Sequence, residues 1–184
     1  LHDFALLAQD NVGNCYMATA KSGVYPTVFD NTMMKAPIPS LLPTAYNVSD
    51  GYTFQEVGSV TYVPQTPNGF NGMAVSPNFL YTYDGAVLKK WNSSTGALLG
   101  SVTVTASSFK WGGLQVDDCD HIFVGAQNSV KQYDVNLNLV ATIAANNTVY
   151  DLKLGQNGLL YACGLGFVQS FQVTLPPCSA LALT

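Results

Sequence analysis

The chain of 184 residues contains no arginine, and only one of its eleven acidic residues, Glu56, is a glutamate. Charged residues make up 10% of the sequence, against about 25% in an average soluble domain. Without arginine there is no guanidinium group to clamp phosphates or read base edges, so we expect no nucleic-acid partner. Scarce Glu, Lys and Arg also argue against long exposed helices, whose solvent faces are normally built from these residues. We therefore expect an all-β protein.

Long apolar runs are missing as well. No stretch approaches the roughly 18 apolar residues of a membrane helix, and the net charge of −4 opposes binding to an anionic lipid surface. We expect no membrane insertion. The chain starts at Leu1 without a basic and apolar leader, so any signal peptide is expected upstream or removed. The hydrophobic content of 48% is sufficient for the core of one large domain or part of one.

Four cysteines, Cys15, Cys119, Cys163 and Cys178, are widely spaced and form no C-x-x-C pair. With only two histidines beside them, a zinc site is poorly supported. The spacing fits buried thiols or one or two disulfides, and three pairings of four cysteines stay open. For a single bridge we favour Cys163 with Cys178, because the C-terminal tail could fold back over the last hairpin.

An internal repeat organises the chain. Two aromatic positions recur at spacings of 42 and then 38 residues. Each unit holds three short runs of alternating apolar residues, a fourth run follows in two units, and Asn, Asp or Gly turns separate the runs. Four strands in about 40 residues are typical of a β-propeller blade. The recurring aromatic residues are Tyr81, Phe123 and Tyr161 at the first position, and Trp91, Tyr133 and Phe171 at the second.

An earlier unit begins near Phe4 and carries roughly 25 extra residues, in segments 21–30 and 36–50. Proline places these segments in loops or irregular edges, where repeat proteins commonly bind partners. We predict about four antiparallel four-stranded blades, which form the C-terminal part of a larger β-propeller. The predicted propeller spans 1–175, with blades at about 1–66, 67–107, 108–146 and 147–175, and 176–184 form a tail or closing strand.

One acidic stretch is a candidate cation site, because Asp117, Asp118 and Asp120 lie within four residues and hard cations bind carboxylate oxygens. The stretch lacks the ligand set of an EF-hand and falls where each unit turns from its first to its second run. Aspartates at such turns cap their own backbone, so we expect a turn. His121 could act as a general base, but no nucleophile elbow, H-E-x-x-H or paired Glu accompanies it. We therefore expect no catalytic residue, no metal and no cofactor.

Aromatic side chains could form a binding surface by stacking on sugar rings. Trp91 occupies a repeat position, so we predict that it packs between blades. Four other aromatic residues have no repeat equivalents, and we predict that they belong to binding loops: Tyr25, Tyr46, Tyr52 and Trp111.

The run WGGLQVDDCDHIFVG at 111–125, followed by SVKQYD at 129–134, resembles propeller segments of very large secreted Bacteroidetes proteins. The segments 148–151 and 161–168 share this resemblance. In that group the propeller precedes adhesin-type repeats and a C-terminal type IX secretion signal of the gliding-motility-associated kind. The resemblance implies an extracellular or cell-surface module. The 184 residues hold neither the repeats nor the sorting domain, so type IX export is implied by analogy only.

The function we expect is that of a non-enzymatic extracellular propeller module of a large adhesin-like protein. It would bind protein or glycan or serve as a rigid structural unit, with other blades or domains of the same protein as partners. One alternative is a propeller-class enzyme, of the lyase or metal-dependent lactonase type, with acids at the inner-strand ends. The inner runs show only Asp117 and Asp151 there, which disfavours it. The other alternative is a passive type IX secretion cargo domain.

Overall fold

The computed structural model describes residues 2–11, 13–22, 29–37, 60–62, 72–105, 113–155, 158–175, 177 and 178. All regular elements within these residues are β-strands, which confirms the all-β prediction. The strands form four sheets in which each strand pairs antiparallel with the next along the chain. Among the described residues there is no helix of the length and apolarity needed to cross a membrane.

Each sheet is a run of consecutive strands joined by short turns or longer connections. The first sheet contains β1 (His2–Gln9), β2 (Asn14–Ser22), β3 (Phe29–Pro37) and β4 (Val60–Tyr62). The second contains β5 (Gly72–Val75), β6 (Phe79–Tyr83), β7 (Val87–Asn92) and β8 (Leu98–Thr103). The third contains β9 (Leu114–Val116), β10 (Ile122–Gly125), β11 (Ser129–Tyr133) and β12 (Leu139–Ala144). The fourth contains β13 (Val149–Leu154), β14 (Leu159–Gly164) and β15 (Phe167–Gln172).

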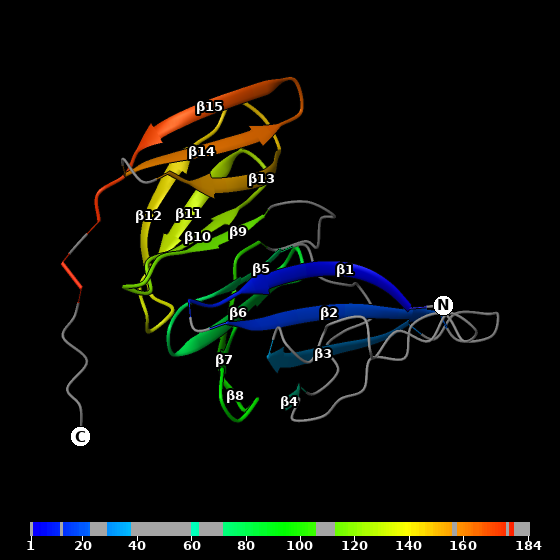
Figure 1. The fold of residues 1–184 in the computed structure, drawn as a ribbon. Coiled ribbons are helices and arrows are strands. Elements are labelled where there is room, and N and C mark those ends of the chain that lie inside the picture. The colour runs from blue at the N-terminus through cyan, green and yellow to red at the C-terminus, as the bar shows by residue number, and fades with distance from the viewer. Residues whose placement is uncertain are drawn as a thin grey trace.

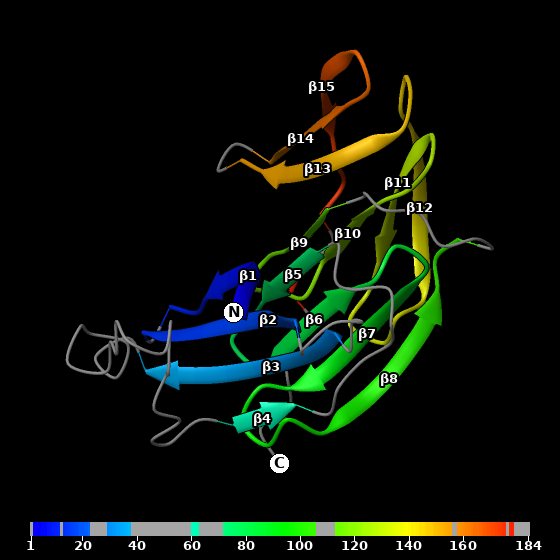
Figure 2. The ribbon, with the colours of Figure 1, turned by 90° about the vertical axis from the view of Figure 1, so that its right-hand side faces the viewer.

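The first strands of the four sheets lie side by side in one row, called the inner row. Strand β1 packs beside β5, β5 beside β9, and β9 beside β13, and the sheets spread outward from this inner row (Figures 1 and 2). The outermost strands β8 and β12 lie on the side away from it (Figure 2). The turns that follow the inner strands are therefore the parts of different sheets that can meet in space.

Two glycines allow neighbouring inner strands to approach closely. A Cβ atom at Gly72 would lie 2.6 Å from the Cβ atom of Leu114, on the next inner strand. One at Gly113, whose φ is +61°, would lie 2.8 Å from the backbone nitrogen of Leu152, again on the next inner strand. Gly72 and Gly113 hold the same position in the repeat, so the repeat encodes a contact between strands as well as the strands themselves.

The two recurring aromatic positions face opposite sides of each sheet. Trp91 is fully buried with Met73, Leu80 and Tyr16, between the second and first sheets. Its indole nitrogen donates a hydrogen bond to Thr82 Oγ1 at 3.0 Å. The predicted packing role of Trp91 is thus confirmed. Tyr81 is buried against the third sheet instead, so the second sheet contributes one aromatic residue to each of its two interfaces.

The tail after β15 returns along the third sheet. Gln132 Nε2 donates a hydrogen bond to the carbonyl oxygen of Thr174 at 3.1 Å, and Cys178 forms a disulfide with Cys119, with the two Cα atoms 4.9 Å apart. Cys163 is free and exposed. The predicted Cys163–Cys178 bridge is therefore wrong, because the tail passes the last hairpin and reaches the turn between β9 and β10 (Figure 1).

Candidate functional site

The turn between β9 and β10 is closed by the carboxylate of Asp117. Its Oδ1 accepts the backbone N–H groups of Cys119 and His121, each at 2.9 Å. Its Oδ2 lies 2.6 Å from His121 Nδ1. Asp117 thus caps its own turn, as expected for an aspartate at this position. It also orients the imidazole ring of His121, because the contact is made at one ring nitrogen, Nδ1.

Two further bonds tie this turn to distant parts of the chain. Asp120 adopts a positive φ of 61°, and its Oδ1 accepts a hydrogen bond from the Tyr81 hydroxyl at 2.8 Å, in a buried position. Burial and the charge of Asp120 together raise the pKa of Tyr81 well above its ordinary value. Cys119 is held by the disulfide to Cys178. Four of the five residues 117–121 are therefore anchored by side-chain bonds.

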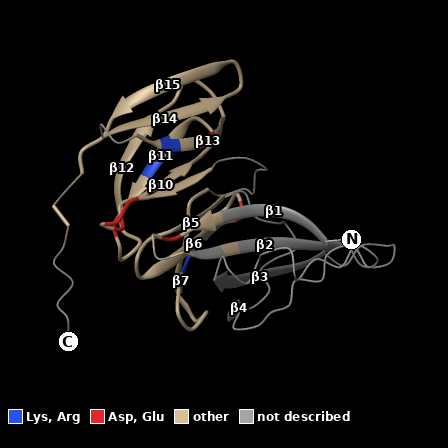
Figure 3. Ribbon diagram, viewed as in Figure 1, with Lys and Arg blue, Asp and Glu red and all other residues tan. Residues whose placement is uncertain are grey.

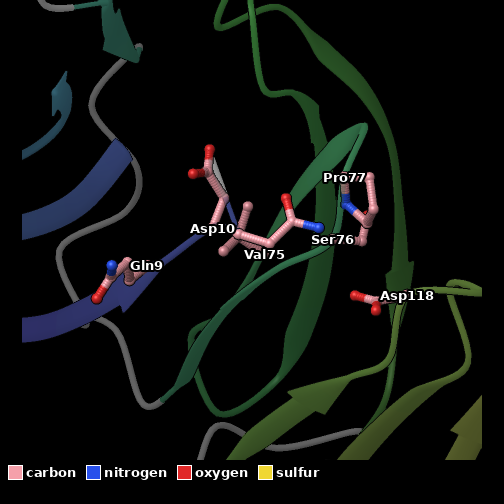
Figure 4. Close-up of a pocket in the computed structure, with 7 residues that line it drawn as sticks. Gln9, Asp10, Val75, Ser76, Pro77 and Asp118 are labelled. Atoms are coloured by element: carbon pink, nitrogen blue, oxygen red, sulfur yellow. The ribbon is translucent and has the colours of Figure 1, made fainter. Parts of the chain in front are cut away.

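The fifth residue, Asp118, is exposed and lines a pocket of about 270 Å³. This pocket lies where β1 and β5 end and where the turn after β9 begins, so three sheets contribute to it (Figure 4). The Asp118 carboxylate is turned toward the space beside Ser76 and Pro77 (Figure 4). The lining residues are Gln9, Asp10, Asn11, Val75, Ser76, Pro77 and Asp118.

A second carboxylate, that of Asp10, reaches the pocket from the end of β1. Its Oδ2 accepts a hydrogen bond from the buried Tyr16 hydroxyl at 3.3 Å. Burial first, and the Asp10 charge second, raise the pKa of Tyr16 to about 12. Tyr16 therefore stays protonated at neutral pH and acts as a donor that holds Asp10 in place.

The electrostatic character of the pocket is acidic. None of its lining residues is basic, and the blue lysine segments of Figure 3 lie on strands such as β11 and β13. Lys90 donates to the carbonyl oxygen of Val135 at 2.8 Å, and Lys131 donates to that of Val104. These two lysines link the second and third sheets. The pocket consequently favours a neutral or cationic ligand over an anionic one.

The structure places the predicted site residues in different surroundings. Asp117, Asp118 and Asp120 do not converge, because they bond His121, face the pocket and bond Tyr81, respectively. In the part of the chain that the structure describes, no three His, Cys, Asp or Glu side chains gather as a metal-binding group would. The predicted binding-loop residues Tyr25, Tyr46, Tyr52 and Trp111 lie outside the described residues.

Asp10 and Ser76 were not among the predicted site residues, although the repeat contains a signal for them. Both directly follow the last residue of an inner strand, as Asp117 does. Because equivalent positions of successive blades lie close together, the repeat predicts that these residues meet. A search for local motifs cannot find them, because they are separated by more than forty residues of sequence.

No family model matches the chain, and neither does any curated protein. Solved structures do match its fold. A gluconolactonase from Xanthomonas campestris is 18% identical with a TM-score of 0.57, over 86% of this chain and 52% of its own length. A luciferin-regenerating enzyme is 13% identical with a TM-score of 0.54, over 88% and 53%. A calcium-binding protein, regucalcin, from Agrobacterium tumefaciens is 14% identical with a TM-score of 0.55, over 88% and 52%.

The chain has a β-propeller fold. It spans about half the length of these matching structures. Their fold confirms the architecture expected from the repeat. The number of blades and the place of this chain within a propeller are separate questions, and the predicted blade boundaries stay predictions.

The expectation of a non-enzymatic module is wrong, because two of the matching β-propellers are enzymes, a gluconolactonase and a luciferin-regenerating enzyme. The alternative of a propeller-class lactonase agrees better with these findings. The error has a physical cause: the polar groups of a propeller site come from turns of different blades, so no local motif announces them. The extracellular location, type IX export and surface partners stay predictions.

Proposed function

We propose that this chain is part of an enzyme-type β-propeller that hydrolyses a neutral lactone in the pocket between its first three sheets. The observation that carries the proposal is the anchored turn that presents Asp118. Its neighbours Asp117, Cys119 and Asp120 are bonded to His121, Cys178 and Tyr81, so the Asp118 carboxylate faces the pocket from a fixed backbone. A positioned group of this kind is what acid–base catalysis requires.

In the proposed reaction, Asp118 acts as the general base. Its carboxylate takes a proton from water while the water oxygen forms a bond to the carbonyl carbon of the lactone. The tetrahedral intermediate collapses with cleavage of the ring carbon–oxygen bond, and the proton passes from Asp118 to the released ring oxygen. Lactone and water thus give one hydroxy acid. The product ionises to a carboxylate, which Asp10 and Asp118 repel, and this repulsion favours release.

The substrate class follows from the pocket lining. Side-chain amide, hydroxyl and carboxylate groups from Gln9, Asn11, Ser76 and Asp10 can exchange hydrogen bonds with the hydroxyl groups of a polyhydroxylated ring. None of the described lining residues is basic, which disfavours phosphorylated or carboxylated substrates. The proposed reaction uses protein groups alone. The matching gluconolactonase supports a lactone as substrate.

The test is lactone hydrolysis by the protein that includes its adjoining blades. The reaction is measured through the release of acid in a weakly buffered solution. Asp118→Asn keeps the side-chain shape and removes the base, so we expect kcat to fall by about 10²–10⁴-fold. Asp84→Asn is the matched control. Asp84 lies outside the pocket and caps a turn through Oδ1, at 3.0 and 2.7 Å from the N–H groups of Ala86 and Val87, and the Oδ1 atom of an asparagine can accept the same bonds. Equal activity of Asp118→Asn and the parent protein would refute the proposal.

We infer further that the four sheets are blades in the C-terminal part of a larger propeller. The support is that the chain matches only about half the length of the propellers it resembles. We also propose an oxidising compartment, outside the cytoplasm. The Cys119–Cys178 disulfide supports it, because such bonds persist mainly in secreted proteins.

A further inference from the structure

The fourth sheet has one covered face and one uncovered face among the described residues. Leu152, Leu160 and Ala162 are buried in a cluster with Phe123 of the third sheet. Because side chains alternate along a strand, the residues between them point the other way. Tyr161 is 38% exposed, and Val168 is 80% exposed. Large apolar side chains on the outer face of this sheet therefore contact solvent.

The repeat shows that this face differs from its equivalents. Leu88 pairs with Tyr83, Val130 with Gly125, and Val168 with Cys163, at the same place in three successive sheets. Leu88 and Val130 are 0% exposed, against 80% for Val168. The first two are covered because the following sheet packs on them.

The first recurring aromatic position of the repeat shows the same contrast in exposure. Tyr81, Phe123 and Tyr161 hold equivalent places on β6, β10 and β14, and the first two are fully buried while the third is 38% exposed. A strand edge accompanies this exposure. Strands β7 and β11 each pair on both sides, whereas the equivalent strand β15 pairs only with β14 within the described residues. The fourth sheet thus combines an uncovered face with an unpaired edge, which proteins normally protect.

We propose that this face, called the seam face and formed by Asp151, Lys153, Tyr161, Cys163 and Val168, receives a further β-sheet of the same propeller, from a part of the protein outside these 184 residues. The inference rests on the proposed larger propeller and adds where that propeller closes. Continuity of the repeat supports this, because the second and third sheets bury the positions equivalent to Tyr161 and Val168 under a following sheet. The residues line a shallow pocket of about 140 Å³, together with Leu152 and Ala162.

The chemistry of the incoming sheet follows from the existing interfaces. Tyr81 and Leu88 are covered by the aliphatic side chains of Leu114, Ile122 and Val124, so the seam face is expected to receive a similar aliphatic surface. Near the inner row the seam face differs from the equivalent faces of the second and third sheets. Asp151 stands where Gly72 and Gly113 stand in the preceding sheets, and it is exposed. Its Oδ1 accepts the backbone N–H of Leu152 at 2.8 Å, so Oδ2 is the oxygen that a hydrogen-bond donor or a cation of the incoming sheet would meet.

Cys163 supplies a probe for this contact, because its thiol is free and lies on the seam face. Modification by an aromatic disulfide reagent, with the site identified by peptide mass spectrometry, should be rapid in the 184-residue chain. In the longer protein that includes its adjoining blades it should be at least about tenfold slower, because a covered thiol reacts only after local opening. Equal rates in the two proteins would overturn the proposal.

A second comparison is made entirely within the longer protein. Val168→Lys places a charge in the proposed interface, so we expect fast modification of Cys163 and a melting temperature lower by about 3 °C or more. Leu99→Lys is the matched control, since Leu99 is 51% exposed on the outer strand β8. It should alter neither property. No change with Val168→Lys contradicts the proposal.

A third outcome concerns a second copy of the chain. If the 184-residue chain already protects Cys163 and has a solution mass of twice 19.6 kDa, another copy covers the face and the proposed occupant is wrong. None of these readouts depends on lactone turnover. Loss of the seam contact and failure of the proposed hydrolysis can therefore be distinguished.

Discussion

The side chains of the turn 117–121 have different roles. Asp117 closes the turn and orients the imidazole, while Asp120 accepts the buried hydroxyl of Tyr81. Each of these bonds fixes the backbone on one side of Asp118. With the backbone fixed, only the side-chain torsions of Asp118 have to be ordered when a substrate arrives, which lowers the entropic cost of reaching a reactive geometry.

Buried tyrosines should make the fold sensitive to alkaline pH. Burial raises the pKa of Tyr16 to about 12, and it raises those of Tyr81, Tyr83 and Tyr133. In the unfolded chain these groups ionise near pH 10. Their contribution to stability is therefore fully present below about pH 10 and is lost as the pH rises toward the folded values. We expect the urea midpoint to hold from pH 8 to 10 and to fall above it.

The variant Tyr16→Phe tests the cause of this alkaline sensitivity. It removes one ionising group but keeps the ring that packs with Trp91, so the midpoint should fall less steeply above pH 10 than in the parent chain. If the urea midpoint of the parent chain stayed constant up to pH 12, the assignment of the alkaline sensitivity to buried tyrosines would be wrong.

At the scale of elements, close contact between inner strands depends on glycine. Gly113→Ala would place a methyl group 2.7 Å from Asp151 Oδ1 and 2.8 Å from two backbone atoms of the next strand, at a positive φ. We expect a loss of about 3 kcal/mol or more in the free energy of unfolding. Gly166→Ala is the control: φ is +76° there, but the new methyl would meet nothing within 4 Å.

The control should show only the backbone strain, about 1–2 kcal/mol. Denaturant unfolding of both variants measures the difference. Equal losses would mean that the inner strands separate at little cost, and the role assigned to Gly113 would be wrong.

The strands could be predicted from the sequence because each depends on a local pattern that recurs. The runs 79–83 and 122–125 coincide with β6 and β10, and the repeat position of Trp91 alone predicts its packing role. The disulfide and the pocket could not be derived in this way. They depend on which turns meet, and Asp10 joins Asp118 only because β1, β5 and β9 lie side by side.

At the scale of the whole molecule, the disulfide connects the end of the described chain to the mouth of the inner row. Cys119 and Cys178 are 59 residues apart. Closing a loop of that length lowers the entropy of the unfolded chain and so raises the free energy of unfolding by about 4 kcal/mol. Reduction should therefore lower the free energy of unfolding by about that amount. It should also slow the proposed hydrolysis, since the Asp118 turn loses one of its anchors.

Cys178→Ser provides the internal check for this prediction. Without a reducing agent the variant should resemble the reduced parent chain, and adding the agent should change nothing further. If the parent chain unfolds at the same urea concentration with and without reductant, the bridge contributes no stability.

The first residues of two turns that follow inner strands satisfy their polar groups locally, and this has an evolutionary consequence. Ser76 satisfies its hydroxyl and its N–H within its own turn, against Phe79, and Asp117 does the same at the equivalent place. The packing between sheets depends on other residues, such as Trp91 and Leu114. A pocket-facing residue such as Ser76 can therefore change during evolution at little cost to the packing between sheets.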